Sequence, residues 1–147
     1  MSNRQLAETA AVLAIKAGTA NSTPLVTPYV AVQNVESLRL VAALGDMASE
    51  TIDVAIYQAT DTSGTGAKVA KAATQLAAHA TNNDNKAIVV GMRKDELDLT
   101  NGFKFVAGRA VTGGATGGAC GLVLDGGGNR YGPAADIDST VVSEVKI

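Results

Sequence analysis

A run of glycines between residues 109 and 132 is the first feature of this sequence that suggests chemistry. It reads RAVTGGATGGACGLVLDGGGNRYG. Glycine-rich loops bind phosphate groups when a helix starts directly after them, because the backbone N–H groups and the helix dipole then meet the anion. Here the first glycine pairs are followed by ACGLVLDG, which has the composition of a strand, and the last group is followed by Pro133. We therefore interpret these glycines as turn residues that tolerate a positive φ angle.

Other residues that often perform chemistry lack the partners that they would need. The segment GTGAK at residues 64–68 has a lysine but not the spacing of a phosphate-binding loop. His79 is the only histidine, which excludes a multi-histidine metal site, and no Gly-x-Ser-x-Gly elbow accompanies it. Cys120 is the only cysteine and lies in an apolar run, so we expect a small buried hydrophobic residue.

Acidic residues offer one alternative, a cation site. Asp95, Glu96 and Asp98 lie close together in the chain, and Asp136 and Asp138 could add oxygen ligands. The spacing of a calcium-binding EF-hand loop is absent. We therefore predict no metal, no cofactor and no catalytic residues, and we expect that the protein is not an enzyme.

The composition argues against two classes of binding partner, nucleic acids and membranes. The net charge is −2 and the basic residues are scattered, whereas a nucleic-acid groove normally has a basic excess. No apolar stretch approaches the ~20 residues of a membrane span. The first residues, MSNRQLAETAAVLAIKAG, do not resemble a secretory signal. We expect that the protein is made in a cytoplasm and that it binds neither nucleic acid nor a membrane.

The elements that must position these residues are predicted to be strands. Leu38, Leu40 and Ala42 would lie on one side of a strand with Arg39 and Val41 on the other, and the segment TIDVAIYQA at 51–59 alternates between its two faces. About eight such short segments are separated by turns rich in Gly, Asn, Asp and Thr. This pattern is typical of an all-β fold, an antiparallel β-sandwich or jelly-roll-like barrel.

Several segments of this fold are predicted more specifically. Residues 1–24 are expected to be an N-terminal arm that ends in a strand, ahead of a single sandwich domain over 25–147. Residues 68–80 could be a helix or a strand. We expect one helical turn near 94–102, then a strand from Phe103 that forms a hairpin with ACGLVLDG. The prolines at 24 and 28 favour an edge or crossing strand after them, and 139–147 are expected to be the last strand.

Three segments carry a resemblance to a known group of proteins. They are TIDVAIYQATDTSGTGAK, the strand-and-turn unit NKAIVVGMRKDELDLTNGFKFVAGRAV, and the late GGGNRYGPAADID. Together they resemble small accessory proteins that tailed bacteriophages and prophages encode near the major capsid protein. The resemblance covers roughly residues 35 to 138. This chain has Phe-x-Val where some of those proteins have Tyr-Val-Arg.

The resemblance implies a component of the virion, most plausibly a capsid decoration (cement) protein that stabilises the outer shell. Its implied partners are the major capsid protein and further copies of itself, with a symmetric trimer favoured. The arm, the loop around Gly64 and the loop from Gly126 to Pro133 are then the expected contact surfaces. Within and around them, the candidate contact residues are Leu13, Ile15, Leu25, Val26, Tyr29, Gly64, Asn129, Arg130 and Tyr131.

Two other functions remain open at this point. A head–tail connector or tail component would also be structural but would form rings. A carbohydrate-binding or receptor-binding β-sandwich is the alternative from another class. Sugar binding usually uses exposed Trp or Tyr platforms, and this sequence has no Trp and three Tyr.

Overall fold

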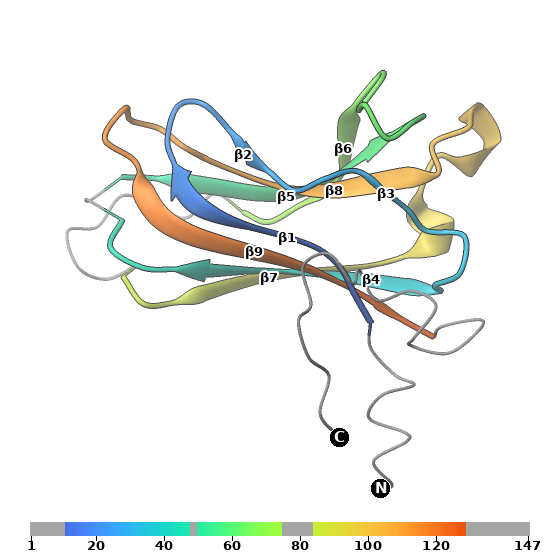
Figure 1. Cartoon of the computed structure of the whole chain (residues 1–147), viewed down its shortest axis with the longest axis horizontal. Helices are drawn as coiled ribbons and strands as arrows, with labels where there is room; N and C mark the ends of the chain where they lie inside the picture. Colours follow the sequence, from blue (N-terminus) through green and yellow to red (C-terminus); the bar gives the residue numbers. More distant parts are fainter. Residues whose placement is uncertain (1–10, 48–49, 75–83, 129–147) are drawn as a thin grey trace, which may run out of the picture.

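The fold is an antiparallel β-sandwich, as the sequence predicts. The computed structural model describes residues 11–47, 50–74 and 84–128. Within them, β1 (Ala11–Ala20), β9 (Gly118–Gly127), β4 (Ser37–Leu44) and β7 (Ala87–Arg93) form a four-stranded sheet in that order. The other sheet has the order β2 (Leu25–Val26), β8 (Phe105–Thr112), β5 (Ile52–Ala59) and β6 (Lys68–Ala72), and β3 (Val30–Ala31) also pairs with β8. Figure 1 shows the two sheets as stacked layers.

The core lies between the layers and is built from the inward positions of each strand. The predicted alternation is confirmed in β4, where Leu38, Leu40 and Ala42 are buried, and in β5, where Ile52, Val54 and Ile56 are buried. Because successive side chains of a strand point to opposite faces, each of these strands gives the core one apolar row. The largest fully buried side chains are Leu40, Met47, Ile52, Ile56, Leu122, Leu124, Val32, Val35, Val54 and Val106.

Glycines inside the strands let the two layers approach closely. A Cβ atom on Gly108 of β8 would collide with the side chain of Leu40, which comes from the opposite sheet. A Cβ atom on Gly126 of β9 would lie 2.6 Å from Cγ1 of Val35. One on Gly118 would lie 2.7 Å from Sδ of Met47. These glycines therefore serve packing, because a side chain at each position would push against a buried neighbour.

The connection between β8 and β9 corrects one prediction. ACGLVLDG was expected to form a hairpin with the preceding strand, but β9 pairs with β1 and β4 in the other sheet. The intervening turn, residues 113–117, therefore crosses from one sheet to the other, and Gly117 in it has a φ of +77°. β9 also extends to Gly127, so Gly126 and Gly127 belong to a strand and not to the predicted loop. Local sequence signals a turn here, but it does not specify which sheet receives the next strand.

Residues 11–20, which the sequence assigned to the arm, form β1 and pair with β9 along its length, with one irregularity between Val12 and Ala14. Leu13 and Ala14 are part of the core. The strand at the end of the predicted arm is thus an edge strand of the four-stranded sheet. Residues 1–10 lie outside the described part of the chain.

The remaining local predictions have different outcomes. Residues 68–72 are a strand, and 75–83 and the expected last strand at 139–147 lie outside the described residues. β7 ends at Arg93. The helical turn expected near 94–102 is present as two 3₁₀ turns, η1 (Lys94–Glu96) and η2 (Leu99–Asn101), followed by Gly102 with a φ of +83°.

Prolines 24 and 28 flank β2, which lies at the edge of its sheet as expected. Thr27 continues this edge after β2: its N–H donates to the Gly108 carbonyl, and its hydroxyl accepts from the Gly108 N–H, both at 2.9 Å. Pro28 follows and has no N–H to donate, which an edge position tolerates.

Candidate interaction surfaces

Cys120 is buried at the inner face of β9, as the sequence predicts. Burial raises the pKa of its thiol to about 11, so the reactive thiolate form is scarce near neutral pH. His79, Asp136 and Asp138 lie outside the described residues.

The acidic residues of the 94–102 segment are held by basic partners. The Lys68 ammonium lies 2.5 Å from the Asp98 carboxylate, and the Lys71 ammonium lies 3.0 Å from that of Glu96. Asp95 pairs with Arg93 at 3.0 Å. Within residues 11–47, 50–74 and 84–128, no group of three or more His, Cys, Asp or Glu side chains is arranged to hold a metal ion. The pairs made by Lys68 and Lys71 join β6 to the segment of the 3₁₀ turns, and all three carboxylates have a cation beside them.

The outer face of the four-stranded sheet carries a row of β-branched side chains. Ile15 lies directly opposite Val123, Val123 opposite Val41, and Val41 opposite Val89, so the row crosses all four strands. Directly paired residues in an antiparallel ladder present their side chains on the same face. Ile15 is 37% exposed and Val89 is 59% exposed. We call this row the apolar stripe.

Small residues and one ion pair flank the apolar stripe. The next row along the strands consists of Ala17, Gly121, Ala43 and Ala87, again in register across the sheet. On the other side, the Arg39 guanidinium lies 2.7 Å from the Asp125 carboxylate. Because the small residues project little, this face is flat and apolar over two adjacent rows. Contiguous exposed apolar surface of this kind marks interaction sites in soluble proteins.

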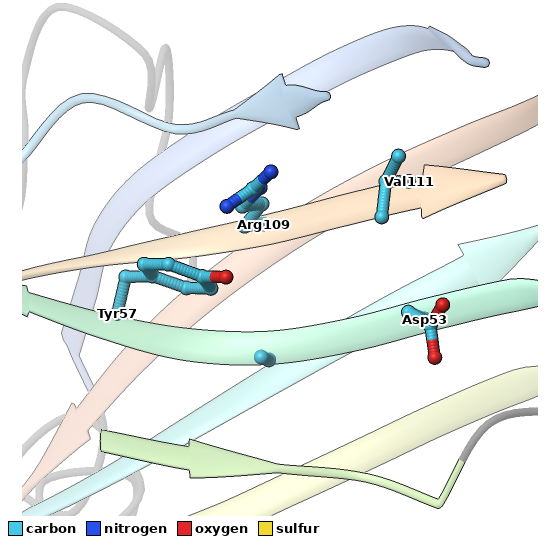
Figure 2. A pocket seen from close by; sticks show the side chains of 5 residues that line it. Asp53, Tyr57, Arg109 and Val111 are labelled. Atoms are coloured by element: carbon cyan, nitrogen blue, oxygen red, sulfur yellow. The ribbon is translucent and has the colours of Figure 1, made fainter. Parts of the chain in front are cut away.

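The outer face of the five-stranded sheet is different and contains a hollow of about 230 Å³. It is lined by Asp53, Ala55 and Tyr57 of β5 and by Arg109 and Val111 of β8. Figure 2 shows Arg109 and Tyr57 near one end of the hollow, and Asp53 and Val111 at the other. Ala55 lies directly opposite Arg109 in the ladder, and its small side chain leaves the space between the two ends.

Arg109 is held in this hollow by an aromatic ring. Its guanidinium carbon lies 4.7 Å from the centroid of the Tyr57 ring, which is the geometry of a cation–π contact. Its Nε atom is shielded from solvent and has no hydrogen-bond acceptor among the described residues. Buried hydrogen-bond donors without an acceptor are rare in folded proteins, so this Nε atom is an unusual feature of the structure.

Tyr29 extends the same cluster. Burial raises the pKa of the Tyr29 hydroxyl, and the charge of Arg109 opposes part of that rise. The ring also covers Gly64, where a Cβ atom would lie 2.8 Å from Tyr29 Cε2. Gly64 has a φ of +82° in a loop that Asp61 organises by accepting hydrogen bonds from the N–H groups of Ser63 and Thr65 at 2.9 and 3.0 Å.

The structure thus brings some of the predicted contact residues together and separates others. Tyr29 and Gly64 are in contact, and Val26 is paired with Arg109, which lines the hollow. Leu25 packs against the core, and Leu13 is buried in it, so Leu13 is not a surface contact residue within this chain. Ile15 belongs to the apolar stripe on the opposite face of the sandwich. Asn129, Arg130 and Tyr131 lie outside the described residues.

The sequence pattern did not identify Arg109, Val41, Val89 or Val123 as site residues. Their grouping depends on which strands pair and in what register. The one local signal was a charged residue, Arg109, within an otherwise apolar strand.

No protein-family model matches this chain, and a search of curated proteins also finds no match. Within the described residues, no helix has the length and apolar character needed to cross a bilayer.

Proposed function

We propose that this protein is a structural virion protein, a capsid decoration protein that binds the outer surface of the shell and stabilises it. The observation that carries the proposal is the apolar stripe with its flanking row of small residues. A decoration protein must lie flat on other protein surfaces and bind through many modest contacts. A sheet face that presents Ile15, Val41 and Val89 beside alanines and glycine suits such packing, because sheets stack closely when their side chains are apolar and of similar height.

The energetics favour association on this face. Val89 is more than half exposed. A valine side chain stabilises a protein chiefly when it is removed from water. A partner that covers the stripe would remove several such side chains from water at once. The ion pair between Arg39 and Asp125 at the margin of the stripe gives the face a polar rim, as in many protein interfaces.

The carbohydrate-binding alternative has less support from the geometry. Sugar rings stack on exposed aromatic faces, and in the hollow the guanidinium of Arg109 already lies over the Tyr57 ring. Tyr29 packs on Gly64 instead of standing free. The function that we propose therefore rests on a protein–protein surface, with the major capsid protein and further copies of this chain as partners. A symmetric trimer on the capsid surface is the assembly that we favour.

The test is to measure the mass of the purified protein by light scattering and then to sediment it with empty capsids assembled from the major capsid protein of the proposed virion. We expect a small oligomer, a trimer, that co-sediments with the capsids at a fixed saturating ratio. A six-fold or twelve-fold ring that ignores the capsid wall would contradict the proposal and favour a connector or tail component. A monomer that does not co-sediment would also contradict it.

A further inference from the structure

We infer that the hollow beside Arg109 is a carboxylate-binding site that receives a Glu or Asp side chain from a protein partner. This site lies on the outer face of the five-stranded sheet, opposite the apolar stripe. The inference therefore does not depend on which surface binds the capsid, and the two can fail separately.

The first step of the argument is the state of Arg109. A guanidinium has five N–H donors, and buried ones are normally matched by acceptors. Here the Nε donor is shielded from water and has no acceptor among the described residues. The group is kept in place by stacking on Tyr57, so its orientation does not depend on an acceptor within the described fold. Arg109 is thus held in position with hydrogen-bonding capacity to spare.

The second step is to identify the chemical group that would accept hydrogen bonds from Arg109. Carboxylates match the planar fork of a guanidinium, often through two parallel hydrogen bonds, and charged acceptors form the strongest of these bonds. Ala55, Val111 and the Tyr57 ring also line the hollow, beside Asp53 at its far end, and these apolar surfaces suit an aliphatic stem. A Glu or Asp side chain combines a short apolar stem with a carboxylate at its tip.

The size and charge of the hollow argue against other ligands. Its volume of about 230 Å³ is below the roughly 300–1,000 Å³ of typical small-molecule pockets, which favours one inserted side chain. Arg109 is the one cation among the described residues that line the hollow, which matches the single negative charge of a carboxylate better than the two of a phosphate. Because the face of Tyr57 is covered by Arg109, a sugar ring has no free platform there.

The experiment uses the full chain labelled with ¹⁵N and follows the Arg109 Nε–Hε signal by NMR. The probes are an acetylated and amidated Gly-Glu-Gly peptide and the matching Gly-Gln-Gly peptide, which differ only in the carboxylate. We expect the Glu peptide to shift the Arg109 signal in a saturable way. The Gln peptide should bind roughly tenfold more weakly or worse, because it lacks the charge that strengthens the hydrogen bonds.

Two variants separate recognition from folding. Arg109→Met keeps an unbranched stem as far as the position of Nε and removes the guanidinium, while Arg109→Lys keeps the charge and removes the fork. The amide signals of β5 and β8 report whether each variant retains the fold. In a folded Arg109→Met protein, the shifts that the Glu peptide causes in the amides of Ala55 and Val111 should disappear, and Arg109→Lys should retain them only in part.

Several results would overturn the inference. They are equal responses to the Glu and Gln peptides, no saturable response to the Glu peptide at tens of millimolar, and an unchanged response in folded Arg109→Met. Saturable shifts with inorganic phosphate or with a monosaccharide, in the absence of a response to the Glu peptide, would instead assign the hollow to those ligands.

Discussion

At the scale of single residues, Gly108 of one sheet and Leu40 of the other pack closely against each other. Leu40 is fully buried, and its methyl groups occupy the space where a side chain at position 108 would begin. The same relation joins Gly126 to Val35 and Gly118 to Met47. A core made of Val, Ile, Leu and Ala with few aromatics is thin, and these glycines allow such small side chains to fill it without voids.

This packing predicts the effect of adding one methyl group. Gly108→Ala should lower the free energy of unfolding by about 1–3 kcal/mol, because a close-packed core resists an inserted carbon. Chemical denaturation would measure the loss. Leu40→Ala alone should cost about 2–5 kcal/mol, and the double variant should cost less than the sum of the two, because the new methyl group fills part of the cavity. Additive costs would contradict a direct contact between the two sites.

Glu50 is a second residue with a defined role, at the crossing turn between the sheets. Its carboxylate accepts hydrogen bonds from the N–H groups of Thr116 and Gly117 at 3.1 and 3.0 Å. Hydrogen bonds from the Thr112 hydroxyl and from these backbone groups hold the pKa of Glu50 below its ordinary value. The ionised carboxylate therefore fastens the turn from β8 to β9.

The lowered pKa of Glu50 predicts how stability changes with pH. A group whose pKa is lower in the folded state stabilises the fold above its unfolded pKa, and this contribution is lost as the pH falls through the folded pKa. Wild type should therefore be more stable than Glu50→Gln above roughly pH 5, and the difference should shrink as the pH falls below the usual glutamate pKa of about 4.3. Denaturation at a series of pH values measures this. A difference that stays constant down to pH 3 would exclude the ionised carboxylate as its source.

At the scale of elements, β1 determines what can be removed from the N-terminus. It contributes Leu13 and Ala14 to the core and pairs with β9 from Ala11 to Ala20. If residues 1–20 belonged to a separate arm, their deletion would leave the fold unchanged. The structure changes that expectation, because the deletion would turn β9 into an edge strand and uncover the core beneath β1.

We therefore predict different outcomes for two truncations. Removal of residues 1–10 keeps every contact described here and should leave a cooperative thermal transition close to that of the full chain. Removal of residues 1–20 should lower the melting temperature strongly or abolish the transition, since a strand and its buried side chains are lost. Circular dichroism melts of both proteins test this. A deletion of 1–20 that melts like the full chain would show that β1 adds little to the sandwich.

The elements also show what the sequence could and could not predict. Alternation identified the inward rows of β4 and β5, because one face of each strand is buried and the other is not. Pairing was harder. The residues between Gly113 and Gly117 looked like a hairpin turn, yet they carry the chain to the other sheet. The contact of Arg109 with Tyr57 follows from the pairing of β5 with β8. The alignment of Val41 with Val89 and Val123 follows from the pairing of β4 with β7 and β9, so no local pattern could reveal either group.

At the scale of the whole molecule, the sandwich presents two unlike faces to its surroundings. One face is flat and apolar around Ile15, Val41, Val89 and Val123. The other holds Arg109 and Tyr57 around a hollow lined also by Asp53. A molecule with two different faces on opposite sides can bind one partner on each. This arrangement suits the proposed role on a capsid shell, in which the apolar stripe is the face that binds.

The most direct measurement compares the capsid binding of two valine variants. Val89 lies in the apolar stripe and is 59% exposed, whereas Val69 lies on β6 of the other sheet and is 48% exposed. Val89→Lys and Val69→Lys therefore make the same chemical change at similarly exposed strand positions. After a melt confirms that both are folded, co-sedimentation with empty capsids gives the occupancy of each. We predict that Val89→Lys loses most of its capsid binding and that Val69→Lys retains it. Full binding by Val89→Lys, or equal loss by both variants, would contradict the assignment of the apolar stripe as the binding face.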